Sequence, residues 1–329
     1  MMMNVASPAL APSVLLVGEA LVDEFRERRV AGGAPFNVAR SLAALRPGLP
    51  VCLVTRLHPA DEGGAALLAS SLRFNLSLAG IQHEPVHATG RVAVVEEGGA
   101  HRFEIHAPSA WDFIELAPAQ ALLVAAPPAF FYFGSLAQRG AVSRASIRAL
   151  AQQAGELGST RYLDLNLREG SSEPLLAAES LALSDWLKVN ELELAQLFAW
   201  FGTADDAQAD MLGDASALAA PVQRLMQRFC VQRLILTRGA AGYAAFDAQG
   251  EVLAQDSGLA LSAMVDTVGA GDAFSAMLLS ACLAGFELAQ ALALANRYAA
   301  ALCGERGPLP DDDAFFAPWR ALLLKESTR

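Results

Sequence analysis

The residues best suited to chemistry lie in one short segment, 266–274, which reads Asp-Thr-Val-Gly-Ala-Gly-Asp-Ala-Phe. Its small residues, 269–271, leave the backbone almost bare, and the apolar run over 273–283 predicts a buried helix after them. Free N–H groups at a helix N-terminus attract anions, so this turn predicts a phosphate-binding site. Asp272, in the first turn of that helix, would repel a phosphate unless it took a proton from a hydroxyl group beside it. The alternative is a plain glycine-rich turn whose aspartate favours the helix dipole.

A second group of polar residues follows an apolar Val-Leu-Leu-Val run near the N-terminus, which predicts a strand buried in a parallel sheet. Glu19 and Asp23 come after this run, where open α/β sheets place ligand groups. Gly32 and Gly33 would let a ligand approach the backbone closely, and Asn37 adds a side-chain amide that can bind two hydroxyl groups. By itself this cluster also fits the N-terminal turn of an ordinary helix.

Two more clusters follow strand-like runs in the middle of the chain. Asp164-x-Asn166-x-Arg168 sets three polar groups on alternate residues at the end of one run. The arginine suits a phosphate or a sugar oxygen, although it could instead pair with the aspartate. Asn190 begins a predicted helix and fits an ordinary N-cap, while Glu193 could also reach a magnesium-bound water.

A glycine-rich exit from a later strand contains Thr237, Gly239 and Gly242 and is similar to a nucleotide-phosphate loop, although a plain turn explains it equally well. The chain has two lysines, Lys188 and Lys325, and no Gly-x-x-x-x-Gly-Lys-Ser/Thr loop. It also lacks a strand lysine like that of protein kinases, so neither common lysine-based ATP site is available.

The composition and net charge limit the classes of function and partner that the protein can have. The 329 residues are 53% hydrophobic and 18% charged, as in a soluble globular protein, and the net charge of −11 argues against a nucleic-acid partner. Residues 1–12 carry no Lys or Arg, and no apolar run approaches the ~20 residues of a membrane helix. We therefore expect a cytoplasmic protein with no membrane partner. The four cysteines are far apart in apolar surroundings, which predicts buried thiols in a reducing compartment.

Strand-like and helix-like runs alternate along most of the chain, which predicts an α/β fold with a mainly parallel central sheet flanked by helices on both faces. A hairpin is predicted over about 89–107, in which Phe103 and Ile105 form an apolar face. Because a lone hairpin is marginal, we expect it to join the segment at about 23–31 in a small sheet over the main one. No linker is long enough to divide the chain, so residues 1–329 are expected to form one domain.

Together these motifs resemble the PfkB family of ribokinase-like carbohydrate kinases, in order and in spacing, from Val14 to Pro310. The most specific match is segment 266–274, nearly the family's C-terminal signature, and Gly-Gly-Ala-Pro-Phe-Asn-Val-Ala at 32–39 matches the N-terminal one. Three further motifs resemble the fructokinase-type branch: Ser-Ala-Trp-Asp at 109–112, Phe-Gly-Ser-Leu-Ala-Gln-Arg at 133–139 and Asp-Leu-Asn-Leu-Arg at 164–168.

The resemblance implies transfer of a phosphoryl group from ATP to a hydroxymethyl group of a free sugar, with fructose favoured. The implied general base is Asp272, the implied anion hole consists of Gly269, Ala270 and Gly271, and Arg168 is the implied cation beside the phosphates. The implied sugar ligands are Asp23, Gly32, Gly33, Asn37, Phe103 and Asn166. The implied nucleotide ligands are Asn190, Glu193, Thr237, Gly239, Gly242 and Asn296. Glu193 would hold Mg²⁺ through water, and Asp266 matches the acid that helps to hold a monovalent cation such as K⁺ in relatives that use one.

The small sheet would act as a lid that excludes water, and its apolar face could also pair with a second subunit to form a homodimer. Other acceptors stay open within the family: 2-keto-3-deoxygluconate, ribose, tagatose or a nucleoside. A sugar-sensing regulatory protein that lost turnover is a further alternative, although it would not need the base. A nicotinamide dehydrogenase fits poorly, because the glycines of segment 266–274 lack the third glycine and come too late in the chain.

Overall fold

The central element of the fold is a nine-stranded sheet with the order β13-β12-β11-β10-β9-β8-β1-β4-β5. The computed structural model describes residues 13–24, 29–97, 100–168, 172–259, 264–310 and 312–326, without the side chains of 94–97, 100–103 and 325–326. In the order of the sheet, the seven strands β5, β4, β1, β8, β9, β10 and β11 are parallel to their neighbours. The strands β12 and β13 extend the sheet beyond β11 by antiparallel pairing. The strands are β1 (Val14–Val17), β4 (Val51–Leu57), β5 (Ile81–His83), β8 (Phe130–Gly134), β9 (Thr160–Asp164), β10 (Trp186–Asn190), β11 (Arg233–Thr237), β12 (Tyr243–Asp247) and β13 (Val252–Asp256).

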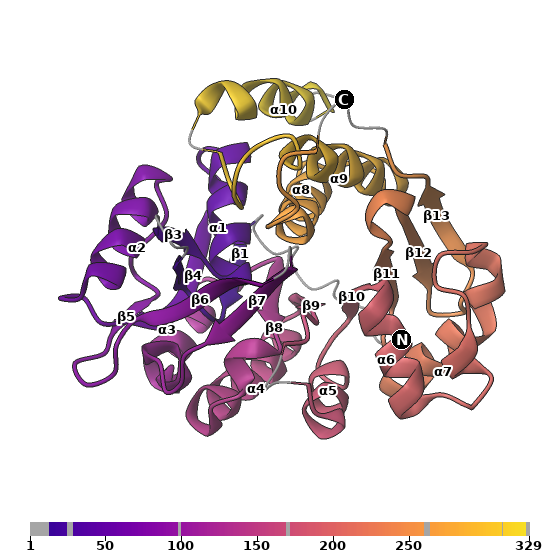
Figure 1. The fold of residues 1–329 in the computed structure, drawn as a ribbon, viewed down its shortest axis with the longest axis horizontal. Coiled ribbons are helices and arrows are strands. Elements are labelled where there is room, and N and C mark those ends of the chain that lie inside the picture. The colour runs from indigo at the N-terminus through magenta and orange to yellow at the C-terminus, as the bar shows by residue number, and fades with distance from the viewer. Residues whose placement is uncertain are drawn as a thin grey trace, which may run out of the picture.

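Helices cover both faces of this sheet, as Figure 1 shows. On one face lie α1 (Ala34–Leu45), α2 (Glu62–Arg73), α8 (Ala270–Leu283), α9 (Leu288–Leu302) and α10 (Asp313–Glu326). On the other lie α3 (Leu116–Ala125), α4 (Ala141–Glu156), α5 (Pro174–Leu181), α6 (Glu191–Phe201) and α7 (Ala219–Phe229). Successive side chains of a strand point to opposite faces, so Leu16 joins the first apolar core while Leu15 and Val17 join the second. The predicted α/β class, with helices on both faces, is confirmed.

A separate four-stranded sheet has the order β3-β2-β6-β7. It consists of β2 (Leu21–Glu24), β3 (Arg29–Gly32), β6 (Gly90–Glu97) and β7 (Ala100–Ile105). The strand β2 pairs in parallel with β6, and the other two pairings are antiparallel. The predicted hairpin therefore forms and joins the segment after β1, as the marginal stability of a lone hairpin requires.

Three parts of the chain differ from the predictions made for them. The helix α3 and the strand β5 were not expected. The segment 203–216, predicted as an exposed loop, contains two short 3₁₀ helices and the buried Asp206. That carboxylate accepts a hydrogen bond from the amide of Thr203 at 2.9 Å and pairs with Arg224, which explains why the segment is ordered. All four cysteines are free thiols, but only Cys303 is buried and Cys230 is exposed, so the prediction of buried thiols was wrong for Cys230.

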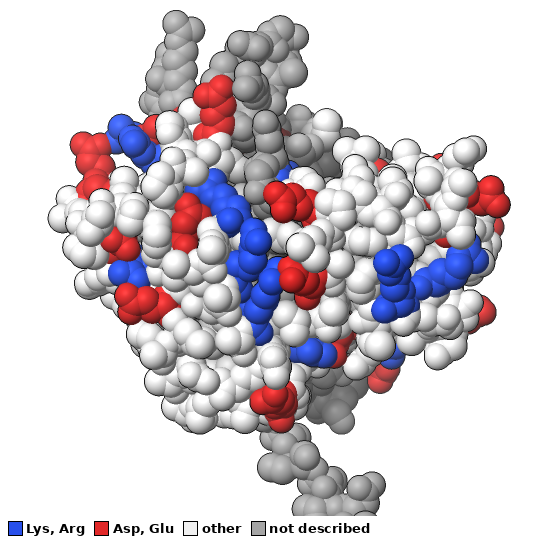
Figure 2. Space-filling view, turned by 90° about the horizontal axis from the view of Figure 1, so that it is seen from below, with Lys and Arg blue, Asp and Glu red and all other residues white. Residues whose placement is uncertain are grey.

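Charged residues of both signs share the surface. On the face seen from below in Figure 2, a narrow band of Lys and Arg side chains crosses the middle, with Asp and Glu on either side of it. None of the helices in the described ranges is long and apolar enough to cross a membrane.

Candidate active site

A cavity of about 570 Å³ opens where the carboxyl ends of several parallel strands meet the N-terminal end of α8. The small sheet contributes Val92 and Ile105 to its wall. Most of the residues predicted for the site line this cavity: Asp23, Gly33, Asn37, Asn166, Arg168, Asn190, Glu193, Thr237, Gly239, Gly242, Gly269, Ala270, Gly271, Asp272 and Asn296. Gly32 and Asp266 are not among the lining residues, and the side chain of Phe103 lies outside the described part of the structure.

The turn before α8 has the geometry of an anion site. Gly269 is the N-cap of α8 with φ 80° and ψ 0°, and a Cβ there would lie 2.7 Å from the Cα of Pro308, so only glycine fits. The amide of Ala270 already donates to the carbonyl of Thr267 at 3.2 Å. The next amides, those of Gly271 and Asp272, belong to the first turn, where N–H groups have no acceptor within the helix. These two amides are therefore the ones that can bind an anion.

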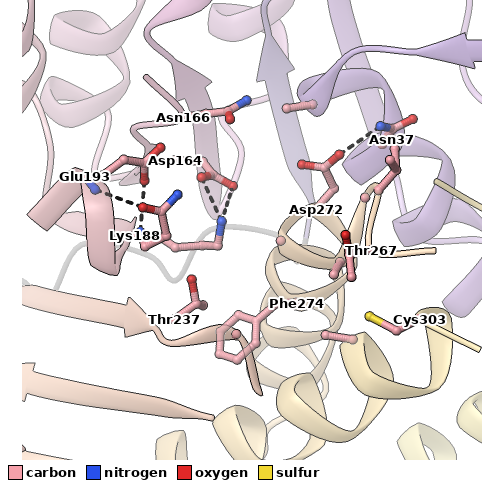
Figure 3. A pocket seen from close by; sticks show the side chains of 18 of the residues that line it. Asn37, Asp164, Asn166, Lys188, Glu193, Thr237, Thr267, Asp272, Phe274 and Cys303 are labelled. Atoms are coloured by element: carbon pink, nitrogen blue, oxygen red, sulfur yellow. Dashed lines mark hydrogen bonds and ion pairs between the residues drawn. The ribbon is translucent and has the colours of Figure 1, made fainter. Parts of the chain in front are cut away.

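Asp272 is held by a residue from the first helix. The Asn37 side chain donates from Nδ2 to Asp272 Oδ2 at 2.8 Å (Figure 3), and Arg40 donates to Oδ1 of the same asparagine at 2.6 Å. Burial raises the pKa of Asp272 to about 6, and the negative charge of Asp164 adds to this shift. The hydrogen bond from Asn37 and the positive charges of Lys188 and Arg168 oppose the shift. A carboxyl group with this pKa is ionised near neutral pH and can still accept a proton.

Two glycines allow close backbone approach among the residues predicted to bind the sugar. A Cβ on Gly32 would lie 2.4 Å from Oδ2 of Asp23, so Gly32 is needed beside that carboxylate although it does not line the cavity. Gly33 caps α1 with φ 101°, and a Cβ there would lie 2.7 Å from the carbonyl oxygen of Glu19. Burial raises the pKa of Asp23 to about 6, against the opposing charges of Arg40 and Arg168.

Glu19 lines the cavity. The sequence placed it at a strand end that suits ligand groups but assigned it no role in the site. Its side chain is buried, and Oε1 accepts a hydrogen bond from the amide of Ala34 at 3.3 Å. Oε2 has no hydrogen-bond partner among the described residues. Burial, together with the negative charge of Asp272, raises the pKa of Glu19 to about 7. Its position at the carboxyl end of β1 was the available signal.

Two of the residues predicted for the nucleotide, Asn190 and Glu193, form a capping box at the start of α6. The predicted N-cap at Asn190 is confirmed, and the reciprocal bond from Glu193 was not predicted. Asn190 Oδ1 accepts from the Glu193 amide at 2.9 Å, and Glu193 Oε2 accepts from the Asn190 amide at 2.9 Å. The other oxygen, Oε1, accepts from the amide of Leu167 at 2.9 Å. A carboxylate oxygen can accept a second hydrogen bond, so Glu193 fits a hydrated Mg²⁺ held through water. Within the described ranges no cluster of three metal-ligating side chains occurs.

Three further residues predicted for the nucleotide also have structural roles. Thr237 Oγ1 donates to the carbonyl of Val189 at 3.3 Å, and Asn296 Nδ2 donates to that of Ser257 at 3.3 Å. Gly242 has φ 87°, and a Cβ there would lie 2.1 Å from the carbonyl oxygen of Asp256. The backbone of this strand exit is therefore fixed close to the cavity.

Asp266 lies next to the anion turn and organises its backbone. Oδ1 accepts from the amide of Val268 at 3.0 Å, and Oδ2 accepts from the amide of Gly307 at 3.1 Å. These bonds join the turn before α8 to the segment after α9. Each oxygen keeps a lone pair, so a monovalent cation that is also bound by backbone carbonyls is compatible with this arrangement.

The cluster Asp164-x-Asn166-x-Arg168 differs from the simple pairing that its sequence allows. Asp164 pairs with Lys188 of the neighbouring strand. The Lys188 side chain is buried and lines the cavity (Figure 3), although the sequence analysis dismissed the lysines as ATP-site candidates. The strand register, which sets Lys188 opposite Asp164, was needed to find it.

Residues 9–313 match the family model of the pfkB family carbohydrate kinases, so the chain belongs to this family. It is accordingly an enzyme that transfers a phosphoryl group to a sugar. Among curated protein sequences, none matches the chain significantly.

Solved structures share the fold over nearly the whole chain. The fructokinase with bound ATP from Xylella fastidiosa is 22% identical, with a TM-score of 0.77, and the match covers 96% of this chain and 99% of that one. The aminoimidazole riboside kinase from Salmonella enterica, complexed with aminoimidazole riboside and an ATP analog, is 22% identical with a TM-score of 0.73 and coverage of 94% and 99%. A double mutant of the fructokinase from Vibrio cholerae O395, in a form with bound fructose, ADP and potassium ion, is 24% identical with a TM-score of 0.72 and coverage of 94% and 99%. Kinases with different acceptors thus resemble the chain about equally.

Proposed function

We propose that this enzyme transfers the γ-phosphoryl group of ATP to a hydroxymethyl group of a free sugar, with fructose as the favoured acceptor. The observation that carries the proposal is the placement of Asp272. Its carboxyl group is half-buried and has a raised pKa, and it lies at an anion-binding helix N-terminus inside a cavity of about 570 Å³.

The reaction breaks the bond between the γ-phosphorus and the oxygen that leaves with ADP, and forms a bond between phosphorus and the sugar oxygen. The proton of the sugar hydroxyl passes to the Asp272 carboxylate. The amides of Gly271 and Asp272 donate to the phosphoryl oxygens, and the dipole of α8 adds to their field. Phosphoryl transfer has a loose transition state, so positioning and charge stabilisation supply most of the catalysis. Arg168 acts as a cation at the phosphates.

The proposed sugar ligands are Asp23, Gly33, Asn37, Phe103 and Asn166, with Gly32 supporting Asp23. The proposed nucleotide ligands are Asn190, Glu193, Thr237, Gly239, Gly242 and Asn296. Mg²⁺, when bound through water at Glu193, would neutralise phosphate charge. A K⁺ ion held by Asp266 is also proposed, supported by the sequence pattern and by the potassium ion bound in the Vibrio fructokinase.

Support for fructose comes from the Asp-x-Asn-x-Arg motif at 164–168 and the Ala-Trp-Asp motif at 110–112, together with fructokinases among the similar folds. Ribose, tagatose, 2-keto-3-deoxygluconate and nucleosides are the competing acceptors, and the riboside kinase among the similar folds illustrates the last of these.

The four-stranded sheet is proposed to act as a lid within a single domain of residues 1–329. Val92 and Ile105 of this sheet line the cavity, so its position suits the exclusion of water from the transferred group. The same sheet is the proposed surface for a homodimer. A cytoplasmic location would suit an enzyme that uses ATP.

The direct test is an ADP-release screen with ATP, Mg²⁺ and a panel of free sugars, sugar acids and nucleosides. We expect fructose to give the highest kcat/KM. A higher value for another acceptor would replace fructose but keep the kinase mechanism. If no acceptor raised ADP release above the rate of ATP hydrolysis alone, the regulatory interpretation would take its place.

A further inference from the structure

Lys188 occupies the middle of β10, a strand that is otherwise apolar in its centre. Leu187 and Val189 on either side of it belong to the core beneath the sheet. Because strand residues alternate between faces, Lys188 points to the opposite face, where α8 and the cavity lie. Only 6% of Lys188 is exposed to solvent. A lysine this buried is unusual and requires a charged partner.

The partner is Asp164 on the neighbouring strand β9, directly opposite in the parallel register. Lys188 Nζ donates to Asp164 Oδ1 at 2.8 Å and to Oδ2 at 2.9 Å (Figure 3). Two further hydroxyl groups fix the same carboxylate: Tyr132 donates to Oδ2 at 3.1 Å, and Ser275 donates to Oδ2 at 3.0 Å. The carboxylate is thus anchored by three elements of the fold, β8, β10 and α8.

The ammonium group lies against the anion turn. A Cβ built on Gly271 would be 3.2 Å from Lys188 Nζ, so the absence of a side chain at Gly271 brings the ammonium beside the first turn of α8. An ammonium has three N–H donors, and among the described residues its hydrogen bonds go to Asp164 alone. With both oxygens of that carboxylate taken, one donor is left for a group in the cavity.

The charge of Lys188 persists despite burial. Burial lowers the pKa of Lys188, but the nearby carboxylates, Asp164 first and then Glu193 and Asp272, outweigh burial and raise it above its ordinary value. A buried ion pair seldom stabilises a fold more than apolar side chains of similar volume would. A purely structural role therefore does not account for a lysine placed at a cavity wall.

We propose that Lys188 is a catalytic residue whose ammonium contacts the transferred phosphoryl group beside the amides of Gly271 and Asp272. Asp164 is the positioning residue that holds the ammonium there. The inference rests on the proposed phosphoryl transfer and adds a buried cation to it. Such a cation, fixed before the substrate arrives, stabilises the charge on the moving group without reorganisation.

The test compares Lys188→Met, Asp164→Asn and the double variant that carries both substitutions. Each single variant leaves one buried partner without its counter-charge, whereas the double variant leaves no unpaired charge. We expect the double variant to keep a melting temperature close to that of the wild type, and its kcat to fall roughly 100-fold or more, as for the loss of one transition-state donor. Arg161→Met with Asp185→Asn is the matched control. This ion pair, with N–O distances of 2.9 and 2.7 Å, joins the other ends of the same two strands. The control variant should have a kcat within about threefold of that of the wild type.

A second measurement does not depend on the acceptor. The affinity for ADP with beryllium fluoride, which occupies the place of the γ-phosphoryl group, is compared with that for ADP alone by calorimetry. Loss of Lys188 should reduce the ratio of the two affinities at least tenfold, because only the first complex has a group for the ammonium to contact. The ratio of the control variant should not change.

The outcomes separate the two hypotheses. Lys188 would be a structural partner only if the double variant had both the stability and the kcat of the wild type. The same conclusion would follow if the ratio of its affinity for ADP with beryllium fluoride to its affinity for ADP alone equalled that of the wild type. If the wild type phosphorylated no acceptor, the proposed function would fail, yet the affinity ratio would still decide the role of Lys188. Should a single variant fail to fold, the double variant carries the test alone.

Discussion

Asn37 donates a hydrogen bond of 2.8 Å from its Nδ2 to Oδ2 of Asp272, across 235 positions of sequence. The asparagine amide cannot turn around, because Arg40 donates to its Oδ1 at 2.6 Å. The orientation of the proposed base is therefore set by the first helix of the chain. Sequence reasoning placed both residues at the site but assigned Asn37 only to the sugar.

We predict that Asn37→Ala moves the acid limb of the pH profile of kcat/KM to higher pH. The hydrogen bond from Asn37 favours the ionised form of Asp272, so its removal raises the pKa of that carboxyl group further above its ordinary value. Asn37→Asp should move the limb further, since a second negative charge would face Asp272. A profile that stays in place in both variants would show that another group controls the acid limb.

Asp272→Asn should keep ATP binding and the fold while sugar-dependent ADP release falls by a factor of roughly a hundred or more. In the wild type, kcat/KM should rise with pH through about 6, the value to which burial raises the pKa of Asp272, because the base must be ionised. Both are measured by coupled ADP assay from pH 5 to 8. A near-normal rate in the variant would refute the assignment of the base.

Glu19 should make the free enzyme less stable as the pH rises. Burial raises its pKa from 4.5 to about 7, so the folded state binds more protons than the unfolded chain within this window. Stability contributed by the protonated form is complete below pH 4.5 and is lost as the pH rises to about 7, on the order of 3 kcal/mol. Glu19→Gln should flatten this slope in thermal unfolding between pH 4.5 and 8. The same substitution at the exposed Glu305 should not alter it.

Gly33→Ala should destabilise the protein more than Gly158→Ala. Both glycines have positive φ, 101° and 88°, so each substitution costs about 1 kcal/mol in backbone strain. A Cβ at Gly33 would in addition lie 2.7 Å from the carbonyl oxygen of Glu19, whereas nothing lies within 4 Å at Gly158. Urea unfolding measures the difference, and equal losses would show that the backbone around Gly33 relaxes freely.

Replacing Val92 and Ile105 by serine should raise ATP hydrolysis relative to sugar phosphorylation several-fold. These residues bring the apolar side of the small sheet to the cavity, and a polar wall would admit water there. Val124→Ser, on the exposed side of α3, is the matched control. An unchanged ratio of the two rates in the double variant would argue against the lid.

The sequence predicted those parts of the site in which local chemistry and position coincide. The N-cap at Asn190 follows from an asparagine before a predicted helix, and the turn before α8 follows from small residues before an apolar helix. The α/β alternation likewise follows from local patterns. The parts of the site that could not be predicted from the sequence depend on how distant segments of the chain are placed relative to one another.

Lys188 illustrates this limit, because the role inferred for it depends on its contacts with Asp164 on the next strand and with Gly271 on α8. Glu19 stood at a predicted strand end, but the absence of a partner for Oε2 is visible only in three dimensions. The helix α3 was missed for another reason. Its sequence, Leu-Ala-Pro-Ala-Gln-Ala-Leu-Leu-Val-Ala, is apolar on all sides and shows no stripe of helical spacing.

The late position of α8 in the chain also determines when a growing chain can become active. The elements that carry the proposed sugar ligands Asp23, Gly33 and Asn37 are synthesised early, and α8 follows only after β9 to β13 (Figure 1). Contacts over such sequence separations form late in folding. A chain whose synthesis stops before α8 would therefore contain the residues proposed to bind the sugar but would lack both the turn before α8 and the proposed base, Asp272.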